Sequence, residues 1–502
     1  MRVGREIWVL TALSALAQII NFSYRVVMAR LVGAEVMGLY QLVMSAYAVI
    51  QAVTTVGLTS AMSNLTAQYL AVGDKEGIRS LRRTCFGLFC CLMVPVGGIT
   101  VLCSDAISVH FLGDARTRLG LILLIPCLTL TAVENLHKNA FYGAGRPVPP
   151  AVAEVWEQFV RAGAILGLLW LFLPQYPERA VGLVMWGMIL CEVSSAVTLC
   201  TLYSHCFGRG GVGIRKETPR QQRSRIYAIA LPVAANALLG NLLGAANSAL
   251  VPRQLVRGGM ERSLAVSKLG VVCGMTMPML ALPTVYLGAL NLIMMPKLAR
   301  AAALNRREEM RRLISEGMER VCALTIPCMT AMAVFGKTLG RLLYGREDVG
   351  EYLLPLAVTV GIGCAVSVLA TALNSIGRQK TVALISLAGG GVQVCCTCFL
   401  TALPGVEMGG FVCGALAAAV LELILCLGAV IRAAGMGLSF GRWLSAPGLA
   451  AALAGLNGNL LLRMLNQTTM PAEFAAGAAF FFAAVQYWLV LRLIGKEIDE
   501  NA

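Results

Sequence analysis

The chain has 502 residues, of which 58% are hydrophobic and only 13% are charged, and its formal net charge is +15. About a quarter of the residues of a soluble domain are charged, so the composition excludes a soluble fold and predicts a polytopic membrane protein. The positive charge is expected to reflect topology and contact with anionic membrane lipids. Nucleic-acid binding is not expected, because no soluble basic domain could carry it.

Apolar segments of about 20 residues, each long enough to cross about 30 Å of hydrocarbon, recur along the whole chain. In chain order, we predict fourteen spanning helices near residues 7–28, 38–62, 84–103, 119–138, 152–173, 181–203, 226–250, 266–296, 319–338, 352–375, 381–402, 409–431, 446–465 and 472–493. The first segment has no convincing cleavage site before Arg25, so it is predicted to be a retained helix rather than a signal peptide. The fold class is therefore an all-α integral membrane protein.

A shift of 232 positions aligns the polar residues of the first half with those of the second. The matched residues are Arg25 with Arg257, Arg30 with Arg262, Glu76 with Glu308, Arg79 with Arg311, Pro95 with Pro327, Gly113 with Gly345, and Gly145-Arg146 with Gly377-Arg378. A tandem duplication of six helices explains this offset. It predicts two parallel-repeat lobes that face each other across a cavity, which is typical of transporters.

The duplication predicts four regions of the chain. These are an amino-terminal lobe over residues 1–203, a basic linker over 204–225, a second lobe over 226–432, and two further helices with a tail over 433–502. The last two helices have no counterpart in the first half, so they are predicted to be an appendage to the duplicated core.

Basic residues concentrate in one set of the predicted loops, which includes Lys75, Arg83, Lys138 and Arg146. Because basic loops favour the cytoplasmic side, both termini are predicted to be cytoplasmic. The stretches 73–83 and 297–318 are interpreted either as solvated basic connectors, which is the favoured interpretation, or as interfacial helices that join one spanning helix to the next.

Charged residues at membrane depth are the most informative, because they usually face a partner or a wet cavity. The fifth predicted helix contains Glu154, Glu157 and Arg161 on one face, and Glu157 and Arg161 are one turn apart and able to pair. Either they form an ion pair that holds helices together, or they line a polar cavity; the sequence leaves both open. Glu134, Glu192 and Glu422 are weaker candidates of the same kind.

Four arginines occupy equivalent positions in the two halves: Arg25, Arg30, Arg257 and Arg262. Long arginine side chains near a helix end can snorkel to lipid headgroups. A guanidinium also binds phosphate oxygens in a bidentate manner, so four of them around one cavity would suit a pyrophosphate-linked substrate. Asn236 and Asn247 are further candidates for substrate contact, but hydrogen bonding between helices is the favoured role for them and for Asn241.

The 17 cysteines lie mostly inside predicted spans, and none have zinc-site spacing. The three histidines are dispersed, and no glycine-rich phosphate loop is present. We therefore expect no disulfide framework, no metal and no cofactor, and we expect a protein that is not an enzyme.

Several stretches resemble the stage V sporulation protein B group, in the polysaccharide-transporter branch of the multidrug/oligosaccharidyl-lipid/polysaccharide (MOP) flippase superfamily. They are Tyr24-Arg-Val-Val-Met-Ala-Arg30 through Gly38-Leu-Tyr40, Phe141-Tyr-Gly143-Ala-Gly145, Glu157-Gln-Phe-Val-Arg161, Val251-Pro-Arg253, Leu282-Pro283 and Met295-Pro296. The resemblance extends from the first helix to the last and depends on the order and spacing of these stretches together.

The resemblance implies an alternating-access fold in a bacterial cell membrane that flips polyprenyl-pyrophosphate-linked saccharides, such as a peptidoglycan precursor, for the envelope or the spore cortex. It implies that cavity arginines, here Arg25 and Arg30 and less securely Arg257 and Arg262, hold the pyrophosphate. It also implies that the last two helices form a groove for the lipid tail. The family often has an acidic residue where this chain has Asn247, so the coupling ion, or coupling to the membrane potential, is left open.

Other functions remain open from the sequence. A drug/cation antiporter of the same superfamily would need carboxylates in a cavity with few competing cations. A membrane glycosyltransferase would need acidic residues on a large outer loop, and the predicted loops are short. A non-catalytic membrane scaffold in sporulation is a further alternative. The sequence indicates neither the sugar nor the oligomeric state.

Overall fold

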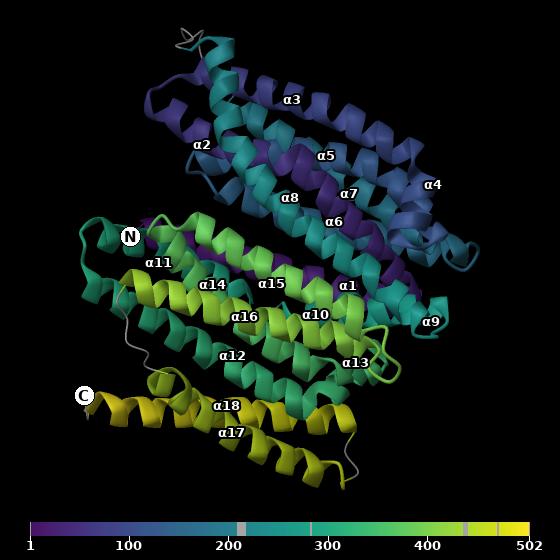
Figure 1. The fold of residues 1–502 in the computed structure, drawn as a ribbon, viewed down its shortest axis with the longest axis vertical. Helices are drawn as coiled ribbons and strands as arrows, with labels where there is room; N and C mark the ends of the chain where they lie inside the picture. Colours follow the sequence, from purple (N-terminus) through teal and green to yellow (C-terminus); the bar gives the residue numbers. More distant parts are fainter. Residues whose placement is uncertain (1, 208–216, 282–283, 435–439, 469–470, 501–502) are drawn as a thin grey trace. The chain divides into compact units, whose positions relative to one another are not determined.

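The computed structural model describes residues 2–207, 217–281, 284–434, 440–468 and 471–500. Over these ranges the chain is almost entirely helical and contains no strand, which confirms the predicted fold class (Figure 1). The basic linker predicted over 204–225 lies partly outside the described residues, which stop at 207 and resume at 217.

The first half of the chain forms the following elements: α1 (Arg2–Gln51), η1 (Ala52–Val56), α2 (Gly57–Ala71), α3 (Lys75–Leu102), α4 (Ser104–Ala106), η2 (Ile107–Leu112), η3 (Ala115–Thr117), α5 (Arg118–Gly143), α6 (Val148–Phe172), η4 (Pro177–Arg179) and α7 (Ala180–Phe207). The remainder forms α8 (Pro219–Arg257), α9 (Arg262–Leu269), η5 (Gly270–Thr276), α10 (Met277–Leu280), α11 (Thr284–Ala303), α12 (Arg307–Tyr344), α13 (Asp348–Glu351), α14 (Leu353–Ser375), α15 (Gln379–Leu400), α16 (Met408–Ala434), α17 (Phe440–Leu465) and α18 (Ala472–Glu500).

Thirteen helical stretches among the described residues are long and apolar enough to cross a membrane. The first stretch, Ala12–Ala71, contains Gly33 with φ 77° and ψ 172°, a conformation that interrupts the helix and that glycine adopts at little cost. Two spans therefore meet at Gly33, and the total is about fourteen, in agreement with the sequence.

The chain packs into two compact units. The first contains residues 1–256 and 260–270, and the second contains 257–259 and 271–502. By packing, α8 and α9 thus belong to the first unit, although the 232-residue offset assigns them to the second repeat. The lobe boundaries at 203 and 226 were derived from the repeat, and superposition of the two repeats stays a prediction.

The duplication is visible in local backbone geometry at the same offset. Gly73 and Asn305, Gly113 and Gly345, and Gly145 and Gly377 all have positive φ. The hydrogen bonds around them repeat as well: the N–H of Asp74 donates to the carbonyl of Tyr69 as Arg306 does to Ala301, and Arg146 donates to Phe141 as Arg378 does to Leu373. The two halves therefore share their helix-ending turns.

Two details of the predicted elements were wrong. The stretches 75–83 and 307–318 are the first turns of the long helices α3 and α12, not separate interfacial helices. Asp74 caps α3 by accepting a hydrogen bond from the backbone N–H of Gly77 at 2.7 Å, which fixes where that helix begins. Lys138 lies within α5 with its side chain 13% exposed, not in a loop.

The span predicted near 266–296 is not one regular α-helix. A π-helix, η5, ends at Thr276, α10 follows with Pro278 at its second position and ends at Leu280, and α11 begins at Thr284. Pro283 lies outside the described residues. Proline cannot donate a backbone hydrogen bond, so a helix interrupted at this point is expected.

Candidate functional site: a buried ionic network

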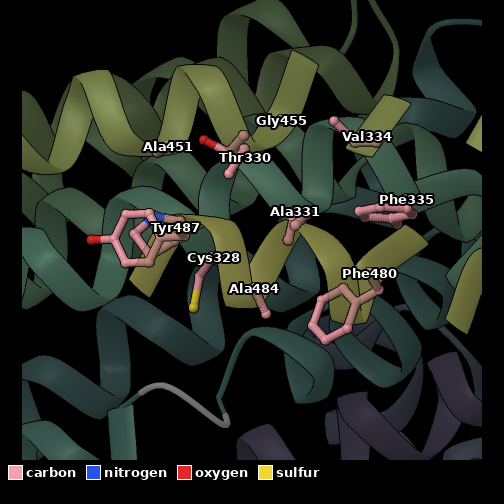
Figure 2. A pocket seen from close by; sticks show the side chains of 13 residues that line it. Cys328, Thr330, Ala331, Val334, Phe335, Ala451, Gly455, Phe480, Ala484 and Tyr487 are labelled. Atoms are coloured by element: carbon pink, nitrogen blue, oxygen red, sulfur yellow. The ribbon is translucent and has the colours of Figure 1, made fainter. Parts of the chain in front are cut away.

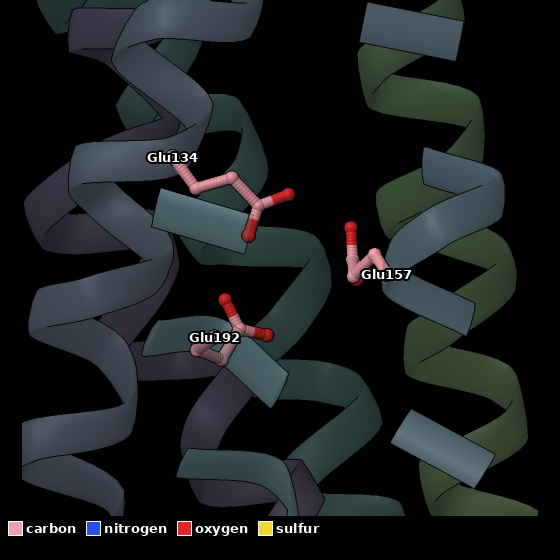
Figure 3. A group of neighbouring side chains, drawn as sticks. All are labelled: Glu134, Glu157 and Glu192. Atoms are coloured by element: carbon pink, nitrogen blue, oxygen red, sulfur yellow. The ribbon is translucent and has the colours of Figure 1, made fainter. Parts of the chain in front are cut away.

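Five charged side chains from three neighbouring helices meet inside the first unit. Glu134 and Lys138 come from α5, Glu157 and Arg161 from α6, and Glu192 from α7. Each basic residue follows an acidic residue of its own helix by four positions, which places the two on the same face. Figure 3 shows the three carboxyl groups pointing toward one another.

The basic residues bridge the carboxylates. Lys138 Nζ contacts Glu134 and lies 2.9 Å from Glu157 Oε2. Arg161 Nη2 lies 2.5 Å from Glu157 Oε1 and 3.3 Å from Glu192 Oε1. Glu157 is thus the centre of the network, because it accepts from both cations. The predicted pairing of Glu157 with Arg161 is confirmed.

Burial makes these contacts energetically important. The carboxyl side chains are 3–6% exposed, Lys138 is 13% exposed and Arg161 is 18% exposed. Three carboxylates face two cations, and Glu192 Oε2 is buried without a hydrogen-bond partner among the described residues. Ligand oxygens of the three glutamates lie within 4.8 Å of one another, so they are the residues that could hold a proton or a small cation.

Arg25 connects to this network through two tyrosines. The guanidinium of Arg25 is half-buried and interacts with the side chains of Tyr24 and Tyr40, both of which are 5% exposed. Arg161 in turn interacts electrostatically with the same two tyrosines. One path of polar side chains therefore extends from the first span to α6, and no carboxylate of the described residues pairs with Arg25.

The other predicted arginines lie in different surroundings. Arg30 and Arg257 are exposed. Arg262 is 56% exposed, and its Nε lies 3.8 Å from Asp114 Oδ2. Burial alone would raise the pKa of Asp114, but hydrogen bonds from Arg116 outweigh it and hold that pKa below its usual value. Asp114 is thus an ionised partner of Arg262.

The remaining candidates are also dispersed. Glu154 is half-buried one turn before Glu157, Asn236 is exposed on α8, and Asn247 is buried on the same helix. A third asparagine, Asn241, donates from Nδ2 to the carbonyl of Ala48 at 3.0 Å, which is the role between helices expected for this group.

The sequence did not point to Lys138 as a member of the site and ranked Glu134 and Glu192 low. A sequence signal did exist for Glu134 and Lys138, because these two charged residues are one helical turn apart inside a long apolar stretch. No comparable signal existed for Glu192, whose basic partner is on another helix.

A second feature is an apolar cavity of about 180 Å³ inside the second unit, between α12, α17 and α18 (Figure 2). Its walls include Ala331, Phe335, Gly455, Phe480 and Tyr487. The rings of Phe335 and Phe480 meet edge to face with centroids 5.7 Å apart. An apolar cavity of about 150 Å³ accommodates a benzene-sized group, so this one can hold a short hydrocarbon segment.

Tyr487 attaches the appended helix pair to the duplicated core. Its Oη donates to the carbonyl of Ala323 at 2.6 Å. Ala323 lies four residues before Pro327, which has no N–H to bond that carbonyl. The α18 hydroxyl therefore satisfies a backbone group that the proline leaves unpaired in a hydrocarbon environment, where such groups are costly.

Comparison with known proteins agrees with this architecture. The profile of the family described as "Polysaccharide biosynthesis protein" matches residues 3–258. The chain belongs to this family. Stage V sporulation protein B of Bacillus subtilis (strain 168) is 23% identical over 359 residues, which cover 70% of this chain and 68% of that protein.

Solved structures share the fold at low identity. Lipid II flippase MurJ in an inward closed conformation has a TM-score of 0.70 at 10% identity, with 97% of this chain and 99% of that chain covered. An inward-facing multidrug resistance MATE family transporter of the MOP superfamily has a TM-score of 0.66 at 15% identity, covering 84% of this chain and 95% of that one. This family member is thus a multi-pass membrane protein with the fold of MOP transporters, and these relatives are transporters rather than enzymes.

Proposed function

We propose that the protein is an alternating-access flippase of a polyprenyl-pyrophosphate-linked saccharide in a bacterial cell membrane, with both termini in the cytoplasm. Family membership and the similarity to stage V sporulation protein B support a role in envelope or spore cortex biogenesis. The fold shared with the lipid II flippase supports a lipid-linked substrate.

The observation that carries the proposal is the environment of Arg25. It is a half-buried cation whose neighbours are the neutral side chains of Tyr24 and Tyr40 rather than a carboxylate. Its donors face neutral tyrosine hydroxyls, which an anion can displace, whereas those of Lys138 and Arg161 are held by glutamates. Charge-assisted contacts from arginine to phosphate are strong and often bidentate, which suits a pyrophosphate.

The apolar cavity beside α17 and α18 supports the lipid part of the proposal. Its lining is almost entirely hydrocarbon and aromatic, and the helices that form it are long enough to span a membrane. We assign this cavity to a segment of the lipid tail. Arg30, Arg257 and Arg262 are exposed and remain further candidates for contact with the pyrophosphate.

The test is translocation of fluorescent lipid II by the purified protein in liposomes, read by accessibility in the outer leaflet. Arg25→Ala is expected to abolish most of the activity. Arg25→Lys should retain a fraction of the activity, because lysine keeps the positive charge but cannot bind phosphate in the bidentate manner of a guanidinium. Arg312→Ala is the matched control, because Arg312 is 81% exposed on α12 and pairs with Glu316. Full activity of the Arg25→Ala, Arg30→Ala double variant would exclude these two residues as the substrate site.

A drug/cation antiporter is the second candidate, and one observation favours it. Three buried carboxylates meet in the first unit, with one oxygen unpaired, and MATE transporters share the fold. Efflux of a cationic dye that is lost in Glu192→Gln, together with absence of lipid II movement, would support the antiporter. Absence of both activities would leave the scaffold role in sporulation.

A further inference from the structure

Sulfur-containing side chains from three helices line a small cavity inside the second unit. The cavity has a volume of about 20 Å³ and lies between α10, α12 and α14. Its walls include Cys328, Met329 and Met332 of α12, Met279 of α10 and Cys364 of α14. Two thiols and three thioethers therefore belong to the wall of a space with room for one water-sized body.

Local packing supports a grouped set of sulfur ligands. A Cβ built on Gly361 would lie 2.8 Å from Sδ of Met329, so this glycine of the cavity wall makes room for the thioether. The thiols of Cys328 and Cys364 interact electrostatically where α12 packs on α14, and both cysteines are free. Cys364 is only 4% exposed, so its thiol is protected from the surface.

The cavity offers little to a water molecule. Among the described residues that line it, none is charged, and the hydroxyl of Thr325 already donates to the carbonyl of Val321 at 2.9 Å. A buried water typically has about two to four polar partners. A soft cation has the opposite preference, because thiolate and thioether sulfur select ions such as Cu(I) over harder ones.

Packing alone does not require sulfur at these positions. The residues 232 positions earlier, in the first repeat, are Tyr47, Val96, Gly97, Thr100 and Ala132. The first repeat therefore builds the corresponding helices without sulfur there. Methionine and cysteine often fill irregular gaps in a core, but in the second unit they surround a gap instead of filling it.

We propose that this cavity binds one soft monovalent metal ion, Cu(I) or Ag(I), through the thiols of Cys328 and Cys364 and the thioethers of Met279, Met329 and Met332. On binding, one thiol releases its proton to solvent and its sulfur bonds the metal. The thiolate cancels the charge of the ion, so the complex is neutral in hydrocarbon, where net charge is costly. Zn²⁺ suits the site less well, because it prefers thiolate, imidazole and carboxylate ligands. The site goes beyond the proposed flippase function and does not rest on it.

The test measures how much Cu(I) the purified full-length protein retains in detergent micelles under anaerobic, reducing conditions. An excess of the chelator bathocuproine disulfonate removes Cu(I) that isolated thiols hold weakly. The parent is expected to retain about one equivalent per chain, because the cavity has room for one ion. Cys328→Ser and Cys364→Ser should each lose this equivalent, since a hydroxyl is a poor ligand for a soft ion.

Cys413→Ser is the matched control, because Cys413 is an exposed, free cysteine of α16 in the same unit. This variant should retain as much Cu(I) as the parent. Equal retention by the parent, the control and both cavity variants would overturn the proposal and show adventitious binding to other thiols. Absence of chelator-resistant Cu(I) in the parent would overturn it as well.

The methionines provide a second test that keeps both thiols. The double variant Met329→Leu, Met332→Leu nearly conserves the apolar volume, which cores usually tolerate, so it decides if the serine variants do not fold. It should weaken Cu(I) binding by about tenfold or more, the scale on which even changes around a metal site act. Unchanged affinity would exclude these thioethers as ligands and overturn the site as proposed.

Thermal stability distinguishes a site inside the bundle from binding at the surface. Because the ligands come from three helices of the folded protein, Cu(I) should raise the Tm of the parent and of Cys413→Ser, but not that of Cys364→Ser. Neither measurement contains a lipid-linked saccharide, and Arg25→Ala should retain Cu(I) fully. A failure of the metal site is therefore distinct from a failure of lipid II translocation.

Discussion

The two repeats share a scaffold but differ in charge. The first contains the network of Glu134, Lys138, Glu157, Arg161 and Glu192. The positions 232 residues later are, in the same order, Val366, Ala370, Gly389, Gln393 and Ile424. None of these is charged, although the turns that end the helices are the same in both repeats. The duplication therefore preserved the helix ends and confined the ionic network to one unit.

Packing in the second unit explains why the network has no copy there. A Cβ on Gly389 would lie 2.5 Å from Cγ of Glu422, so the glycine makes room for a carboxyl side chain that comes from α16. A glutamate at 389 would collide with it and would place a second carboxyl group beside it. Near α14, the second unit instead has an apolar core that includes Val368, Leu369 and Leu373.

The largest expected effect comes from breaking the network at Arg161, which bridges Glu157 and Glu192. Arg161→Ala leaves Glu157 and Glu192 buried with one fewer counter-charge, and removal of one partner of a buried pair costs about 3–5 kcal/mol. Gln393→Ala at the equivalent position of the second repeat should cost far less. The measurement is the free energy of unfolding in micelles or nanodiscs. Equal losses in the two variants would show that the network contributes no special stability to the first unit.

The next effect tests whether Glu157 and Arg161 act as a pair. Arg161→Gln alone leaves Glu157 buried without one of its two cations. In the double variant Glu157→Gln, Arg161→Gln this carboxylate is neutralised together with its partner, so that part of the cost disappears. The double variant should therefore be more stable than the sum of the singles predicts, by about 3 kcal/mol, at the upper end of coupling between contacting residues. Additive losses in a double-mutant cycle would place the two side chains in independent environments.

Much of the fold could be predicted because length, apolar spans and the 232-residue offset are properties of the sequence itself. The helix ends were harder to predict. The amphipathic starts of α3 and α12 resemble surface helices in composition, and only the structure shows that they continue into the spans without a break. The packing of α8 and α9 with the first unit could not be predicted either, because a repeat determines internal symmetry and not which surfaces touch.

The site was predictable only where partners share a helix. Glu157 and Arg161 are four residues apart and were identified from that spacing. Lys138 was counted with the loop residues because it is the last residue of the predicted fourth span, and the helix in fact extends to Gly143. Glu192 reaches the network only through the packing of α7 on α6, which no local pattern encodes.

A third comparison concerns an ion pair outside the spans, in which the aspartate and the arginine have exchanged positions between the two repeats. Asp114 accepts two side-chain hydrogen bonds from Arg116, whereas at the equivalent positions Arg346 donates two to Asp348. The Asp114 side chain is 6% exposed and that of Asp348 is 40% exposed. Asp114→Asn should therefore cost about 1.5 kcal/mol, as for a charged hydrogen bond, and Asp348→Asn less than about 1 kcal/mol, as for a surface pair.

The sign of the pH dependence follows from the lowered pKa of both aspartates. Hydrogen bonds from Arg346 lower the pKa of Asp348, as those from Arg116 do for Asp114 against the effect of burial. A lowered pKa means that the stabilisation is present above the unfolded pKa of about 3.9 and is lost as pH falls through the folded value. The difference in free energy of unfolding between each Asn variant and the parent should thus stay constant as pH falls from neutral. It should disappear in acid, where the aspartate is protonated. A gap that widens in acid would contradict the ionised pairs.

The smallest expected loss of stability concerns a proline that occurs at equivalent positions of the two repeats. Pro95 and Pro327 occupy equivalent positions in α3 and α12, and in the second repeat Tyr487 of α18 donates to the carbonyl of Ala323, which the proline leaves without a helical partner. Tyr487→Phe removes that hydrogen bond and keeps the ring, so it should cost about 0.6 kcal/mol, a typical value for a hydrogen bond between membrane helices. The loss should concern the attachment of the α17–α18 pair, because α18 is the element that supplies the hydroxyl. Proteolysis or hydrogen exchange resolved by helix can detect it, with faster exchange expected in α18 and none in α5, where the ionic network is unaltered. An equal increase of hydrogen exchange in all helices would contradict this prediction. It would mean that the hydrogen bond of Tyr487 to Ala323 does not specifically attach α17 and α18 to the rest of the second unit.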